Sequence, residues 1–155
     1  LLGHTNKGGI TMIHEDTIKL LRECDAGVKM GISSIEDVLD EIHDLRFKEI
    51  LTVCKEKHEE IDKKLQTILD KYHDEGKEPS MMAKSMSWME TNMKLMMDDS
   101  DRKIADIMTD GTNMGVKSLS KYLNQYKAAD EESRDIAKKL IDLEEKLVQD
   151  IRCYL

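Results

Sequence analysis

Apolar residues recur at alternating steps of three and four along most of this chain, and that spacing constrains the fold more than any other feature. Such a stripe follows one face of an α-helix, which must be buried against other helices. The first stripe lies between about Glu15 and Ile42, and the second runs from Asp44, a candidate N-cap, to about His73. Because only a few residues connect them, we predict an antiparallel helical hairpin.

The second half of the chain shows the same arrangement. Gly76 and Pro79 end the second helix, and Ser100 or Asp101 can cap a third long helix. A turn over residues 128–131 leads to a last helix that reaches the C-terminus. The connection of about 25 residues between the hairpins is long enough to run the full length of a bundle. We therefore predict an all-α, four-helix bundle of two antiparallel hairpins joined by a crossover.

Composition agrees with one all-α domain. The chain has one proline, one phenylalanine and one tryptophan, and it lacks the β-branched runs from which a sheet could be built. Residues 12–155 are enough to bury a single core. Residues 1–11 are glycine-rich and aperiodic, so we expect a flexible leader or upstream remnant outside the bundle.

Charge, hydropathy and cysteine use exclude several classes of protein. A net charge of −8 without a basic stripe argues against a nucleic-acid partner. No apolar run approaches the length of a membrane span, and no secretory signal is present, so we expect a cytoplasmic protein without membrane contact. Cys24, Cys54 and Cys153 are widely spaced in apolar helical contexts, which predicts reduced core thiols.

Ionisable residues interrupt the stripes near the middle of the predicted bundle. Asp25, His58 and Glu144 occupy steps that neighbouring repeats fill with aliphatic residues, and Asp110 lies one position from the copy of Asp25. The helical rise places all four within about 7 Å of the bundle midplane. Since a buried charge needs a partner, a proton or a metal ion, a central polar cluster is one interpretation. An ordinary ion pair between Asp25 and Lys64 is the other.

An internal repeat relates the two hairpins. Five residues of the first helix recur 84 residues later as identical or similar residues: Gly27, Met30, Gly31, Ser34 and Ile35, then Gly111, Met114, Gly115, Ser118 and Leu119. Small residues at matching places would let facing helices approach closely. The repeat indicates either two copies of one ancestral hairpin or a packing contact that both hairpins need.

This architecture resembles the ferritin-like superfamily, and especially a branch of small uncharacterised bacterial proteins with an acid-and-glycine motif in the first helix. The motif here is Cys24-Asp25-Ala26-Gly27, and a related Thr109-Asp110-Gly111 occurs in the third long helix. The resemblance spans about residues 16–155. It implies a di-iron site at mid-bundle, with oxidoreductase or metal-storage activity.

The chain departs from the family's ligand pattern, which includes Glu-x-x-His on two helices. Lys55 stands three residues before His58, and the last helix has no histidine. Transfer of ligands from the family therefore reaches only four carboxylates, the last two less closely: Asp25, Asp110, Glu60 and Glu144. We accordingly expect a non-catalytic structural or interaction module, for which a homodimer is one arrangement. An iron- or manganese-binding bundle that uses His58 with these carboxylates is the alternative.

Methionine is concentrated in one segment. Seven of the eleven methionines fall within residues 81–97, and five of them form a single helical stripe. Methionine commonly fills irregular apolar contacts, so the stripe indicates a short crossover helix packed on the bundle. Because soft thioethers also bind copper(I), a copper(I) site in this segment is a third hypothesis.

Overall fold

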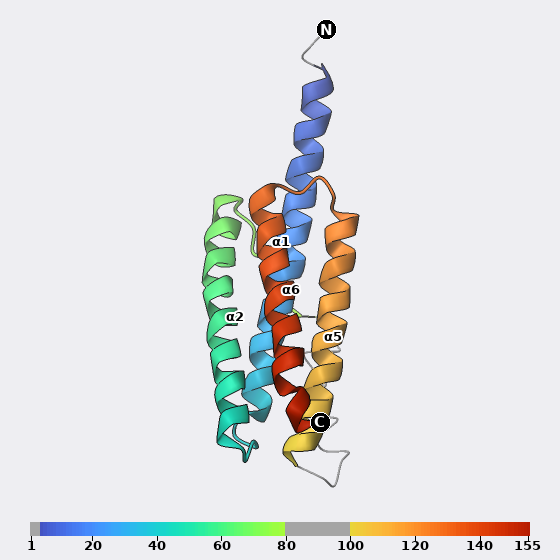
Figure 1. Cartoon of the computed structure of the whole chain (residues 1–155). Coiled ribbons are helices and arrows are strands. Elements are labelled where there is room, and N and C mark those ends of the chain that lie inside the picture. Colours follow the sequence, from blue (N-terminus) through green and yellow to red (C-terminus); the bar gives the residue numbers. More distant parts are fainter. Residues whose placement is uncertain (1–3, 80–99) are drawn as a thin grey trace.

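The computed structural model describes residues 4–79 and 100–155, with side chains from residue 11 onward, and this part of the chain folds into helices and short turns without a strand (Figure 1). The elements are α1 (His4–Leu39), α2 (Leu45–Lys71), α5 (Asp101–Gln125), α6 (Glu131–Ile151) and the 3-10 turn η1 (Arg152–Tyr154). The prediction of an all-α bundle of four long helices is confirmed.

The four helices lie side by side as two hairpins (Figure 1). Helix α1 packs against α2, α5 and α6, while α6 also packs against α2 and α5. The backbone N–H of Asp44 donates to the Asp101 carboxylate at 2.7 Å, so α5 begins beside the turn between α1 and α2. The Tyr72 hydroxyl donates to Asp130 at 3.2 Å, so α2 ends beside the turn into α6. The chain thus leaves α2 at one end of the bundle and enters α5 at the other.

Side-chain caps begin three of the helices. Asp44, Ser100 and Asp130 each accept a hydrogen bond from the backbone N–H three residues later, which satisfies a donor that the first helical turn leaves unpaired. At the end of α2, His73 (φ 53°) and Gly76 (φ 79°) adopt left-handed conformations that turn the chain away from the helix axis. The predicted limits of the second helix agree with α2.

The predicted limits of the first helix were wrong at both ends. Helix α1 begins at His4, inside the segment that we expected to be a flexible leader, and it ends at Leu39 rather than Ile42. Between residue 4 and the expected start near Glu15 there is no proline, and a glycine costs only about 1 kcal/mol in a helix interior. The glycine pair at 8–9 therefore weakens the helix without ending it.

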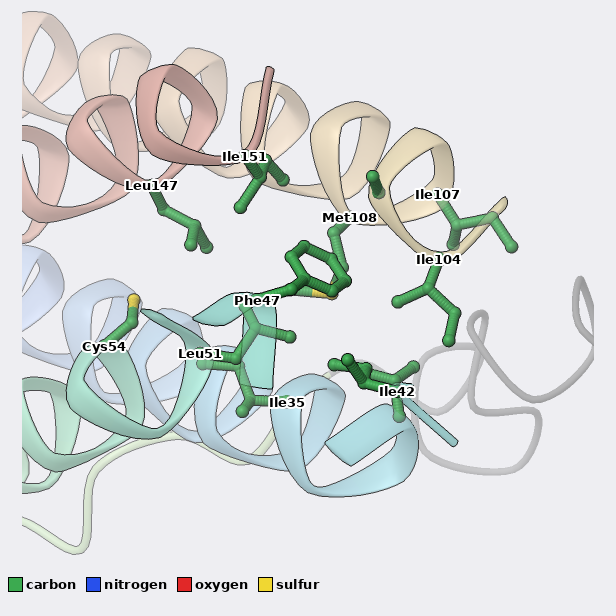
Figure 2. Close-up of a cluster of buried hydrophobic side chains, with 12 residues drawn as sticks. Ile35, Ile42, Phe47, Leu51, Cys54, Ile104, Ile107, Met108, Leu147 and Ile151 are labelled. Atoms are coloured by element: carbon green, nitrogen blue, oxygen red, sulfur yellow. The ribbon is translucent and has the colours of Figure 1, made fainter. Parts of the chain in front are cut away.

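The buried core forms two apolar clusters, stacked along the bundle. Figure 2 shows the first, near the α1–α2 turn, where side chains from all four helices meet. The second lies toward the other end and is rich in leucine: Leu20, Leu21, Leu65, Leu69, Leu119 and Leu140. Along α2 and α6, His58 and Glu144 stand between residues of the first cluster and residues of the second. A polar layer therefore separates the two halves of the core.

The cysteines follow the prediction in part. Cys24 and Cys54 are buried free thiols, whereas Cys153 is an exposed free thiol. Cys153 lies in η1, beyond Ile151, the last buried residue of α6.

Two further expectations concern membranes and the methionine-rich segment. Among the described helices, none combines the length and the apolar character that crossing a bilayer requires. The short helix predicted over the methionine stripe lies outside the described residues.

Candidate ligand-binding site

A histidine–glutamate pair occupies the polar layer at the middle of the bundle. His58 is only 2% exposed and Glu144 only 7%. The Nδ1 atom of His58 lies 2.8 Å from the backbone carbonyl oxygen of Cys54, one helical turn earlier, and this contact fixes the imidazole ring. The Nε2 atom then lies 3.9 Å from Oε1 of Glu144, which is too long for a direct hydrogen bond.

The pair leaves two buried atoms without a partner. Within the described part of the chain, neither Nε2 of His58 nor Oε2 of Glu144 makes a hydrogen bond. A buried polar atom without a partner costs about 1–3 kcal/mol, so native structures rarely keep one unless a function or a bound molecule uses it. These two atoms are therefore the strongest indication of a site.

Burial and mutual contact shift the pKa values of both groups. Burial lowers the pKa of His58, but its hydrogen bond with Cys54 and the nearby Glu144 carboxylate raise that pKa more, to about 10. Burial raises the pKa of Glu144, and the neighbouring His58 offsets only part of that rise. With a pKa of about 10, His58 keeps the pair protonated at neutral pH. With one proton between them, the pair is neutral overall, whichever residue carries it.

Two glycines make room for this pair. A Cβ atom at Gly31 would lie 2.7 Å from Nε2 of His58, and a Cβ atom at Gly115 would lie 2.7 Å from Oε2 of Glu144. Gly31 and Gly115 are equivalent positions of the internal repeat. In each hairpin, the glycine of the first helix accommodates the polar side chain of the second. The repeated glycine thus preserves space for a side chain within each hairpin, which is a packing contact of the kind that was one of the two explanations of the repeat.

A cleft of about 430 Å³ opens beside the pair, between α1 and α5. All ten residues of the internal repeat line it, together with His58 and Glu144. Its lining extends from Glu23 to Ile35 on α1 and from Met108 to Tyr122 on α5, which is roughly 20 Å at the rise of an α-helix. The volume falls within the range of small-molecule sites. Because this volume extends along the whole length of the lining, the cleft is narrow.

The walls of the cleft are mostly apolar. Methionine, leucine and glycine are common among the described lining residues, and three of those residues are ionisable in the neutral range or below: Glu23, His58 and Glu144. Glu23 stands at one end, where its carboxylate accepts a hydrogen bond from Nζ of Lys77 at 2.6 Å. At the middle of the described lining, the ionisable side chains are therefore those of His58 and Glu144, and this pair is neutral overall.

Asp25 is buried, as its place on the stripe predicts, but its hydrogen bonds go elsewhere. Its carboxylate accepts from Nζ of Lys29 at 3.0 Å, from Nε2 of Gln66 at 2.8 Å and from the backbone N–H of Lys77 at 3.0 Å. The ion pair is made with Lys29, one turn along the same helix, and not with Lys64 as we had considered. Asp25 thus anchors the segment that follows α2.

The remaining predicted ligands do not join the pair. Asp110 and Glu60 are exposed on α5 and α2. Among the side chains of residues 11–79 and 100–155, no group of three or more His, Cys, Asp or Glu is arranged to hold a metal ion. The side chains of this region therefore do not fit the two-metal centre that the ferritin-like resemblance implies. Iron or manganese binding stays a prediction.

No protein-family model, curated protein or solved structure matches this chain. The assignment of a function consequently depends on the cleft and its residues.

Sequence reasoning identified His58 and Glu144 but missed most of the cleft. The lining residues Met30, Ser34 and their repeat partners were noticed only as parts of the repeat. The sequence pattern that could have revealed the cleft is the repeat in α1 and α5 together with one ionisable residue on the apolar stripe of each following helix, His58 on α2 and Glu144 on α6. Two equivalent glycines opposite two buried ionisable residues indicate a shared internal space.

Proposed function

We propose that this protein is a ferritin-like four-helix bundle that binds an elongated apolar small molecule in the cleft between α1 and α5. In this proposal the bundle is a binding module and not a di-iron enzyme. The observation that carries it is the pair of unpartnered buried atoms, Nε2 of His58 and Oε2 of Glu144, at the wall of a cleft whose described lining is mostly apolar.

Three features support the ferritin-like part of the proposal. The two hairpins share a repeat, the polar layer lies at mid-bundle, and the connection between α2 and α5 joins opposite ends of the bundle. A connection with such end points is expected of a crossover. The fold alone does not define an activity, so the function is argued from the cleft.

The chemistry of the walls supports an apolar ligand. Burial of apolar surface contributes about 25 cal/mol per Å², and a narrow cleft can cover most of a slender molecule. Since carbon atoms in contact lie about 4 Å apart, the cleft suits a single chain better than a fused ring system. The methionines at equivalent positions on both walls, Met30 and Met114, have flexible side chains that can adapt to such a chain.

The proposal is tested by titrating the protein with a fluorescent dye that emits in apolar surroundings and by competing it with octanol. We expect saturable binding of one dye per chain. Replacement of Ser34, which lines the cleft, by Ser34→Leu should abolish it. The matched control is Ser33→Leu, because Ser33 is the exposed neighbour on the same helix and does not line the cleft.

Two outcomes would overturn the proposal. One is dye binding that Ser34→Leu leaves unchanged, which would place the dye elsewhere. The other is no saturable binding at all, as expected if another part of the chain already fills the cleft.

Metal binding is the second candidate, because an imidazole nitrogen and a carboxylate oxygen without partners are also metal-ligand types. It is tested by measuring iron and manganese in protein purified without chelator, and again in Glu144→Ala and Asp25→Ala. Stoichiometric metal that Glu144→Ala removes and Asp25→Ala retains would favour a site at the pair. The copper(I) hypothesis concerns residues 81–97, which lie outside the described residues.

A further inference from the structure

We infer that the histidine–glutamate pair selects a ligand whose polar end is neutral and both donates and accepts hydrogen bonds, with a primary alcohol as the simplest case. This inference rests on the proposed function of the cleft and deepens it by naming the ligand's head group. The evidence is the arrangement of His58 and Glu144 at the cleft wall.

The pair offers one donor and one acceptor in either of its neutral forms. Because Nδ1 of His58 is engaged with the carbonyl oxygen of Cys54, it keeps its hydrogen. If the ring is protonated, Nε2 donates and the Glu144 carboxylate accepts. If the proton is on Glu144 instead, the carboxyl group donates and Nε2 accepts. A hydroxyl group can complement both forms, since it donates to one partner and accepts from the other.

The separation of the two residues suits a single bridging oxygen. Nε2 and the nearer carboxylate oxygen are 3.9 Å apart. Two hydrogen bonds of about 2.8 Å together exceed this distance, so one oxygen atom between the residues can reach both. The pair is too far apart to satisfy itself and close enough to share one small group.

Charged head groups fit this arrangement less well. A carboxylate only accepts hydrogen bonds, so the Glu144 carboxylate would repel it unless a further proton were bound. An ammonium group only donates, so it would oppose the protonated form of His58. Glu23, which stands at one end of the described lining, is already paired with Lys77.

The discriminating experiment uses the unmodified full chain and compares octanol, octanoate and octylamine as competitors of the bound dye at neutral pH. These probes share one alkyl chain and differ at the head group. A site that hydrogen-bonds a substrate hydroxyl rejects analogues without it, so we expect octanol to bind at least about tenfold more tightly than either ion. Octanamide, which also donates and accepts, should follow octanol.

The results separate this inference from the proposed function. Equal affinity for the alcohol and both ions would overturn the head-group inference while leaving the apolar cleft intact, and preference for octanoate would do the same. Failure of every probe and of the dye would overturn both. In His58→Leu/Glu144→Met protein, the preference for octanol over octanoate and octylamine should disappear; an unchanged preference would overturn the head-group inference.

Discussion

The strongest test of the site's energetics is a double-mutant cycle across His58 and Glu144. The variants are His58→Leu, Glu144→Met and the double substitution, which exchange the two polar side chains for apolar ones of similar size. Each single variant leaves the other ionisable group buried without its partner. The double variant leaves neither ionisable group in the core.

The structure gives the expected magnitudes. Removal of one member of a buried pair typically costs 3–5 kcal/mol, and because the pair borders a cleft we expect the lower limit, about 3 kcal/mol for each single variant. The other contact of His58 is with the Cys54 carbonyl on its own helix, so its loss adds little. Replacement of both members by apolar residues is often neutral, so the double variant should lose less than about 1.5 kcal/mol.

Urea unfolding followed by far-ultraviolet circular dichroism measures all four proteins. The cost of the double variant should be smaller than that of either single variant. If the two single costs simply add in the double variant, the residues are not energetically coupled and the reasoning about the polar layer is refuted.

Three further predictions concern single positions. Gly31→Ala should destabilise the protein by about 1–3 kcal/mol because the new Cβ meets the His58 ring. Gly27→Ala should be neutral or stabilising, because its Cβ would make only ordinary contacts, at 3.7 Å with Leu140 and 3.8 Å with Leu119. Equal urea midpoints for the two variants would contradict this. The pKa of His58 is about 10 in the folded protein, compared with 6.5 for a free imidazole. The protonated His58 therefore contributes its full stabilisation below pH 6.5. This stabilisation is lost as the pH rises toward 10, at up to about 1.4 kcal/mol per pH unit. The unfolding midpoint should therefore fall over this range, and His58→Leu should show a smaller slope; parallel slopes would contradict the assignment. Native protein should react rapidly with a thiol reagent at exposed Cys153 but not at Cys24, because burial raises the pKa of the Cys24 thiol to about 12. Mass spectrometry of the labelled peptides measures the two rates. Early labelling at Cys24 would contradict this prediction.

Helix positions were largely predictable because the information is local. Periodic apolar residues define a buried helical face, and the capping side chains of Asp44 and Ser100 act on backbone groups only three residues away. The start of α1 was missed for a related reason. A glycine pair lowers local helix propensity, but propensity alone does not end a long helix.

The hydrogen-bond partners of the buried ionisable residues were less predictable. They depend on how each helix is rotated about its axis and on which neighbouring side chains lie within hydrogen-bond distance. Asp25, His58 and Glu144 all occupy apolar stripes, and burial of all three followed from that pattern. Their partners did not follow from it. Asp25 is satisfied by Lys29 and by the backbone after α2, whereas Asp110, one position off the stripe, lies at the surface.

By itself, the sequence determined that this chain forms long amphipathic helices with ionisable residues at mid-height. Only the tertiary structure decided that His58 and Glu144 meet, that Gly31 and Gly115 leave them room, and that the repeated residues line a cleft. The physical reason is one of distance. Helical periodicity acts over three or four residues, whereas the pair joins side chains 86 positions apart, and their meeting depends on how two hairpins pack together.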